Sequence, residues 1–148
     1  MEITPATPDD IPQLCSLLAL LFAQEADFQP DADKQAAALH QIIEQPDIGC
    51  ILVMRDGYDC IGMVNLLFTI GTACGGRVAL LEDLIVDPAW RRAGIGSSLL
   101  QAAIDLARDT GCLRVTLLTD RSNISAQQFY QRHGFEASAM LPLRLPLA

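Results

Sequence analysis

The stretch VALLEDLIVDPAWRRAGIG, residues 78–96, contains the features that decide the fold. Its first part, Val78 to Val86, is an apolar run of strand length, and Asp87-Pro88 then stops the strand. The segment Arg91-Arg92-Ala93-Gly94-Ile95-Gly96 follows, with two glycines that allow a tight turn. Apolar residues at helical spacing come next. The sequence therefore predicts a strand, a glycine turn and a helix in close succession.

A helix that begins at such a turn favours an anion. Its free N–H groups and the positive end of its dipole point toward the turn, where the two arginines add positive charge. A Walker A loop and a dinucleotide fingerprint fit poorly, because no Gly-Lys-Ser/Thr occurs and Leu99 stands where the fingerprint needs a small residue. A glycine turn with solvated arginines remains the alternative. We expect a pyrophosphate site formed by Arg91, Arg92, Ala93, Gly94, Ile95, Gly96 and Ser97.

The rest of the chain alternates between strand and helix patterns. Strands are predicted near Ile3 and over residues 51–54, 60–70, 115–118 and from 135 onward. Helices are predicted over residues 7–22, 33–44 and 123–132. Hairpin turns are predicted at residues 56–57 and 71–76. Because no repeat or linker interrupts this order, we expect one α/β domain over residues 1–148, with a mixed sheet and helices on both faces.

Composition excludes several classes of protein. The chain is 51% hydrophobic, which excludes a disordered protein. Its 18 acidic and 10 basic residues give a formal net charge of −8, so neither nucleic acid nor an anionic membrane is an expected partner. A small cationic partner such as an amine suits this charge. The longest apolar stretch, Leu17 to Ala23, is too short to span a membrane.

The cysteines and histidines indicate neither a disulfide framework nor a metal site. Five cysteines are present, an odd number, and no Cys-x-x-Cys occurs. Met1-Glu2 opens the chain without the basic region of a signal peptide. Both features favour the reducing cytoplasm. His40 and His133 lie far apart, so we expect no metal ligand set.

Two motifs, in the right order, resemble those of the GNAT family of N-acetyltransferases. The family's phosphate loop, Gln/Arg-x-x-Gly-x-Gly/Ala, appears here as Arg91, Gly94 and Gly96. The family's second motif, Asn-x-x-Ala-x-x-x-Tyr-x-x-x-Gly-Phe, is complete as Asn123, Ala126, Tyr130, Gly134 and Phe135. The gap between them holds one helix and one strand, as in the family. The resemblance is strong from Val78 to Phe135 and rests earlier on element order alone.

This resemblance implies a GNAT-type fold, a mixed and mostly antiparallel twisted sheet with helices on both faces. It also implies transfer of an acetyl group from acetyl-CoA to an amine. The loop N–H groups would hold the pyrophosphate of acetyl-CoA. The pantetheine arm would pair like an added strand with Leu84, Ile85 and Val86, and Asn123 would hydrogen-bond the arm or the cofactor near it.

The reaction needs a base, because an alkylamine has a pKa of about 10 and must lose a proton before it attacks. Glu82 and Asp83 interrupt an apolar strand, where charges are costly unless paired or wet. Because strand side chains alternate between faces, we expect only Glu82 to share a face with Leu84 and Val86. The Leu-Glu-Asp-x-x-Val run resembles the diamine acetyltransferase branch, whose glutamate acts through water. Glu82 is the predicted base, and Asp83 is an accessory anion at the substrate or a buried structural group. The alternative is that both are structural partners of Arg77 or of a backbone N–H.

The remaining site residues follow from the resemblance. The family places a tyrosine hydroxyl beside the departing sulfur, which makes Tyr130 the predicted acid. The family builds part of its acceptor pocket in the loop after the first helix, so Glu25 is a candidate substrate residue. The expected activity is direct transfer from acetyl-CoA to a small cationic amine. Transfer to a protein or peptide and an inert acyl-CoA-binding sensor are the alternatives. Residues 140–147 suit either a homodimer contact or a last sheet strand.

Overall fold

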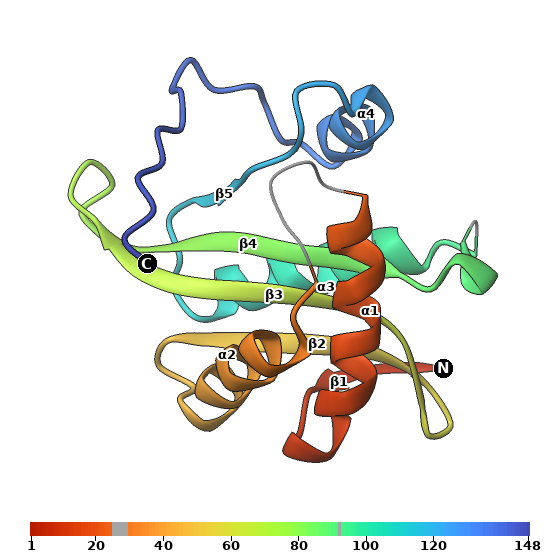
Figure 1. Ribbon diagram of the computed structural model, residues 1–148. Helices are drawn as coiled ribbons and strands as arrows, with labels where there is room; N and C mark the ends of the chain where they lie inside the picture. The colour runs from red at the N-terminus through yellow and green to blue at the C-terminus, as the bar shows by residue number, and fades with distance from the viewer. Residues whose placement is uncertain (25–29, 92) are drawn as a thin grey trace. The chain divides into compact units, whose positions relative to one another are not determined.

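The computed structural model describes residues 1–24, 30–91 and 93–148. The chain divides into two compact units, Met1–Leu118 and Thr119–Ala148, and each is described by itself. The first unit contains a five-stranded sheet in the order β1-β2-β3-β4-β5 (Figure 1). Its strands are β1 (Glu2–Pro5), β2 (Gly49–Asp56), β3 (Asp59–Gly71), β4 (Gly76–Val86) and β5 (Val115–Leu117). Neighbouring strands are antiparallel, except that β4 and β5 are parallel.

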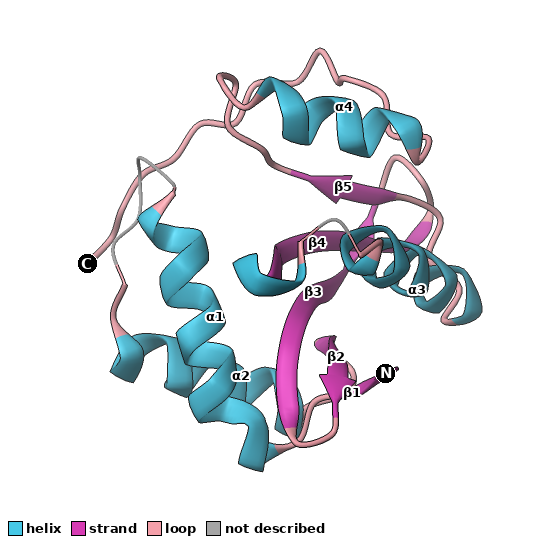
Figure 2. Ribbon diagram, turned by 90° about the vertical axis from the view of Figure 1, so that its right-hand side faces the viewer, coloured by secondary structure: helices cyan, strands magenta, loops and turns pink. Residues whose placement is uncertain are grey.

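Helices cover both faces of this sheet. Figure 2 shows α1 (Ile11–Ala23) and α2 (Ala32–Glu44) on one side of the strands and α3 (Ile95–Asp109) on the other. Two short 3₁₀ helices, Pro8–Asp10 and Pro88–Trp90, precede α1 and α3. The predicted mixed, mostly antiparallel α/β fold is confirmed.

The core on the α1 side forms because apolar residues recur at helical spacing in α1, while β2 and β3 are apolar at nearly every position and so present apolar side chains to both covered faces. Leu14 of α1 packs in the same buried cluster as Val53 of β2 and Met63 of β3, and all three are fully buried. The periodicity read from the sequence thus identified this face correctly.

Gly62 of β3 allows α3 to lie close to the other face of the sheet. A Cβ at this position would lie 2.9 Å from Leu99 Cδ1 and 3.4 Å from Ile95 Cγ2, both on α3. Ile95 and Leu99 are buried in the first turns of this helix. The helix that follows the glycine turn is therefore packed directly against the middle of the sheet.

The second unit contains one helix, α4 (Ile124–Arg132). Gly134 follows it with φ 97°, a left-handed value that ends helices, as the sequence predicts. The strand expected from Phe135 onward is wrong, since residues 135–148 form no strand in the structure. Pro142 and Pro146 disfavour a strand in the last part of this segment, because proline has no N–H to donate to a ladder.

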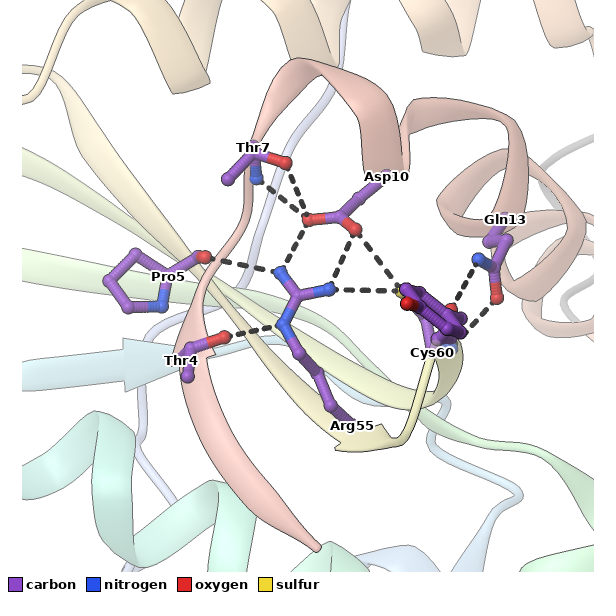
Figure 3. Close-up of polar contacts among 8 residues, drawn as sticks. Thr4, Pro5, Thr7, Asp10, Gln13, Arg55 and Cys60 are labelled. Carbon is purple, nitrogen blue, oxygen red and sulfur yellow. Dashed lines mark hydrogen bonds and ion pairs between the residues drawn. The ribbon is translucent and has the colours of Figure 1, made fainter.

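A partly buried ion pair joins the start of α1 to β2 (Figure 3). Arg55 Nη2 lies 2.6 Å from Asp10 Oδ2 and Arg55 Nη1 lies 2.7 Å from Asp10 Oδ1, a two-point contact. Thr7 N donates to the same carboxylate at 2.8 Å, and Arg55 Nε donates to Thr4 Oγ1 at 2.6 Å. Only 8% of the Asp10 side chain and 19% of the Arg55 side chain are exposed. The pair therefore ties β1, α1 and β2 together.

This ion pair makes stability depend on pH. The Arg55 guanidinium, by hydrogen bonding, holds the pKa of the Asp10 carboxyl well below its ordinary value. A lowered folded-state pKa gives stability that is complete above the unfolded value of about 4 and is lost as the pH falls further. We expect Asp10→Asn to lower the free energy of unfolding by about 3 kcal/mol at pH 7, because it leaves a buried guanidinium without its countercharge.

Urea denaturation checks this expectation. Asp105→Asn is the matched control, because its partner Arg108 is exposed and such pairs contribute less than about 1 kcal/mol. Below about pH 4 the wild-type protein should lose stability faster than Asp10→Asn. Equal slopes in that range would show that Asp10 is not the titrating group.

The structure also describes the cysteines, the lengths of the helices and the groups of side chains that could hold a metal ion. All five cysteines are free. Among the described residues, no helix is long and apolar enough to cross a membrane. Within those same residues, no cluster of three His, Cys, Asp or Glu side chains is placed to hold a metal ion.

Candidate functional site

The amino end of α3 has the form expected of an anion cradle. Gly94 is its N-cap, with φ 75°, and no described side chain caps this end of the helix. A Cβ at Gly94 would meet nothing within 4 Å, so the backbone here borders open space. The first-turn N–H groups of a helix have no intrahelical partner, and the dipole adds partial positive charge at the same place. The structure thus supplies donors, charge and space for a phosphate group.

The other residues of the predicted loop surround this helix end. Arg91 and Ala93 are exposed, Gly96 and Ser97 are half-buried in the first turn of α3, and Ile95 is buried against the sheet. Arg92 lies outside the described residues. The described residues of the loop thus leave the amino end of α3 open on one side, and Ile95 anchors its first turn to the sheet.

A β-bulge in β4 lies on the strand that leads to this cradle. Glu82 pairs with Asn65 of β3, whereas Ile85 pairs with Met63, so β4 has one residue more than β3 between these pairs. Asp83 sits in the bulge with φ 58°, a left-handed value that is uncommon outside glycine and that aspartate tolerates better than most residues.

The bulge overturns the strict alternation expected from the sequence. Met63 and Asn65 are two residues apart on β3 and share one face, so their partners Ile85 and Glu82 share it as well. Val86 pairs with Gly62 and faces the other way. The expectation that Glu82 shares a face with Val86 is therefore wrong, because the extra residue shifts the register.

Both carboxylates of the bulge lie close to Asn65. Glu82 is directly opposite Asn65 and exposed, and Asp83 Oδ2 accepts a hydrogen bond from Asn65 Nδ2 at 3.3 Å. Burial raises the pKa of the Asp83 carboxyl, and the Asn65 hydrogen bond acts in the opposite direction. Glu82 is thus exposed to solvent and Asp83 is largely shielded from it, although the two residues are neighbours in the chain.

The edge of β4 changes partner at the same point. The parallel pairing with β5 ends at Leu81 and Leu117, immediately before the bulge. Within the described residues, Leu84, Ile85 and Val86 pair only with β3 or not at all. A strand in a sheet interior normally bonds on both edges, so this stretch has backbone groups available for an added extended chain.

The second motif forms its own local structure in the second unit. Asn123 is the N-cap of α4, and its Oδ1 accepts from Ala126 N at 3.1 Å. The Tyr130 ring lies edge to face with Phe129 at 5.3 Å and with Phe135 at 5.8 Å between centroids. Asn123 and Ala126 thus meet at the start of α4, and Tyr130 meets Phe135 at its end. These two contacts give the spacing of the motif a structural reason.

Two predicted residues cannot be compared with the structure, and one residue was missed. Glu25 and Arg92 lie outside the described residues. Asn65, which contacts Asp83, was not singled out from the sequence. The signal for it was present, since Asn65 is the one amide side chain in the otherwise apolar run from Cys60 to Phe68.

Known proteins resemble this chain over most of its length. The model of the acetyltransferase (GNAT) family matches residues 13–135. An aminoalkylphosphonate N-acetyltransferase of Salmonella typhimurium is 30% identical over 137 residues, 93% of this chain and 86% of that protein. The uncharacterized N-acetyltransferase YhfO of Bacillus subtilis is 34% identical over 139 residues, 92% of this chain and 90% of that one. An aminoglycoside N-acetyltransferase, AAC(6')-Iy, solved in complex with CoA, shares the fold with a TM-score of 0.82 and 19% identity, over 99% of this chain and 95% of that one.

Proposed function

Since the chain belongs to the GNAT family of acetyltransferases, we propose that it transfers an acetyl group from acetyl-CoA directly to a primary amine of a small cationic molecule. That the protein is an acyltransferase using acetyl-CoA follows from the family. The nature of the acceptor rests on one observation in particular. Glu82 and Asp83 stand together at the β4 bulge of a chain with net charge −8, which favours a cationic acceptor.

In this proposal, the chain binds the acyl donor at two places. The backbone N–H groups from Arg91 to Ser97 hold the pyrophosphate at the amino end of α3. The unpaired edge of Leu84 to Val86 binds the pantetheine arm, and an N–H of this stretch donates to the acyl oxygen as it gains charge. Acetyl-CoA supplies an activated acyl group as a thioester. The hydrogen bond from Asn123 to the pantetheine arm or to the cofactor near it, which the family resemblance implies, stays a prediction.

Proton transfer is assigned to two side chains. Glu82 is exposed, so it accepts the ammonium proton through water and leaves the amine free to attack the carbonyl carbon. The new C–N bond forms, the C–S bond breaks, and the sulfur departs as a thiolate with a pKa of about 8.5, by analogy with cysteine. Tyr130 donates a proton to that thiolate and is the proposed acid. The nitrogen loses its second proton as the amide forms, and this proton returns through water to Tyr130. Asp83 and Glu25 add negative charge that attracts the acceptor.

The relatives support a small acceptor. The Salmonella typhimurium protein acts, by its name, on aminoalkylphosphonates, and a further relative from Stenotrophomonas maltophilia is named for aminoglycosides. Both names describe amines carried by small molecules. A phosphonate is anionic, however, so the two relatives differ in the charge that surrounds the amine, and the acidic bulge favours the aminoglycoside-like case.

Release of free thiol from acetyl-CoA, measured with a panel of amines, tests the proposal. The panel contains a diamine, a polyamine, an aminoglycoside, an aminoalkylphosphonate and peptides with a free N-terminus or lysine. We expect the polycationic small amines to have the highest kcat/KM. Activity on peptides alone would show a protein or peptide acetyltransferase. Binding of acetyl-CoA without activity on any member would favour an acyl-CoA-binding sensor.

A further inference from the structure

Asn65 is a buried polar residue whose presence the packing of the sheet does not explain. It is 3% exposed and lies between Val64 and Leu66, both fully buried and apolar. Its Oδ1 is buried and has no hydrogen-bond partner among the described residues. A buried acceptor without a partner costs stability, and an apolar side chain would avoid that cost. A role other than packing accounts for an amide at this position.

In the part of the chain that the structure describes, Asn65 makes one side-chain hydrogen bond, and its acceptor lies in the bulge. Asn65 Nδ2 donates to Asp83 Oδ2 at 3.3 Å, and Asp83 has φ 58°. A left-handed residue other than glycine is strained and persists when its surroundings hold it in place. The bond from β3 ties down the side chain of the strained residue. Asn65 thus holds the backbone of β4 at the point where its register shifts.

The hydrogen bond between Asn65 and Asp83 matters because of the residues that follow the bulge. Pairing of β4 with β5 ends at Leu81, and the residues after the bulge, Leu84 to Val86, carry the free edge of the strand. The direction of that edge depends on the backbone angles of Asp83. A residue that fixes Asp83 therefore fixes where the donors and acceptors of Leu84 to Val86 point.

We propose that Asn65 is a positioning residue for the acyl donor: its amide holds Asp83 in the left-handed conformation, and the bulge then aims the backbone of Leu84 to Val86 at the donor. The inference rests on the proposed function, in which this edge binds the pantetheine arm. Asn65 does not touch the donor. It acts through Asp83 alone, and its unpaired Oδ1 is the cost of keeping an amide there.

Affinity for acetyl-CoA, measured by calorimetry, tests the proposal together with stability. We expect Asn65→Leu to weaken acetyl-CoA binding about tenfold, as the loss of a hydrogen bond to a carboxylate does. Thermal stability is measured on the same variant, because leucine removes the unpaired acceptor but also leaves the Asp83 carboxyl without its donor from Asn65. Leu39→Ala on α2 is the matched control: this helix packs against α1 and β2, so the buried cavity should lower stability and leave acetyl-CoA affinity unchanged.

Substitutions at Asp83 separate backbone conformation from charge. Glycine adopts φ 58° freely and alanine does not, so Asp83→Gly should retain most of the acetyl-CoA affinity and Asp83→Ala should lose about tenfold. In the Asp83→Gly background, Asn65→Leu should have no further effect on acetyl-CoA affinity. An effect of equal size in both backgrounds would overturn the proposal.

The outcomes also separate this inference from the proposed function. Wild-type affinity in Asn65→Leu would refute the positioning role and leave the acetyltransferase activity intact. A wild-type protein that binds acetyl-CoA and acetylates no amine would refute the proposed acceptor, while the calorimetric comparison of variants would still decide the role of Asn65. Failure of the wild-type protein to bind acetyl-CoA would overturn both.

Discussion

Gly94→Asp should weaken acetyl-CoA binding by at least about 100-fold. A carboxylate at the N-cap of α3 stands where the pyrophosphate is proposed to bind. Two like unit charges 4 Å apart repel by about 4 kcal/mol at an effective dielectric constant of 20, and 1.4 kcal/mol corresponds to a factor of ten in affinity. Aspartate also accepts hydrogen bonds from the first-turn N–H groups, which it then withholds from the ligand.

This substitution should leave the fold intact. Aspartate is a favoured N-cap residue and tolerates left-handed angles, and a Cβ at Gly94 meets no atom within 4 Å. Gly94→Asn is the matched control, because asparagine has the same shape and caps the helix without charge. Calorimetry should show the asparagine variant binding acetyl-CoA substantially more tightly than the aspartate variant. If wild type and Gly94→Asp bound acetyl-CoA with equal affinity, the pyrophosphate would not bind at this helix end.

Glu82→Gln should lower kcat by about 10² to 10⁴-fold, the usual contribution of a general base. Glutamine keeps the size and hydrogen-bonding capacity of the side chain and cannot accept the ammonium proton. Acetyl-CoA affinity should hardly change, because Glu82 is not assigned to the donor site. Stability should also hold, since Glu82 is exposed. Steady-state kinetics with saturating acetyl-CoA measures the loss.

The pH dependence of this variant identifies the role of the residue. As the pH approaches the amine pKa of about 10, the acceptor deprotonates by itself, so the defect of Glu82→Gln should shrink. Glu44→Gln, an exposed glutamate on α2, serves as the control and should match the wild type at every pH. A defect of constant size from pH 7 to pH 10 would mean that Glu82 binds or orients the acceptor rather than taking its proton.

The parts of the fold that the sequence predicts well depend on local patterns. The spacing of Ile11, Leu14 and Leu18 indicates α1, Asp56-Gly57 indicates the β2–β3 turn, and Gly134 marks the end of α4. Each of these features is encoded within a few residues, where periodicity or backbone preference decides. The order of elements and the parallel pair then follow from connection rules.

The errors arise where the structure depends on contacts distant in sequence. The bulge at Asp83 inserts a single residue into β4 and leaves the apolar character of the strand unchanged, so alternation misplaces Val86. Asp10 reads as part of a helix start, and its pairing with Arg55 forms 45 residues away. The last strand was predicted from apolar residues in spite of Pro142 and Pro146.

The candidate site divides in the same way. The glycine turn and its helix could be read from the sequence because an anion cradle is a local structure. The pairing of Asn65 with Asp83 could not, because it depends on the register between β3 and β4. Glu82 and Asp83 are identified because they are charged residues in an apolar strand. The same criterion, a polar side chain in an apolar strand, also applies to Asn65.

The close packing of α3 at Gly62 has a thermodynamic consequence for ligand binding. Ile95 and Leu99 hold the first turns of this helix against the sheet, so its amino end is already ordered before any ligand arrives. A loose loop would lose conformational freedom on gripping a diphosphate, and that loss would be subtracted from the affinity. Here the helix end is preorganised, and the absence of one methyl group in the middle of a strand makes it so.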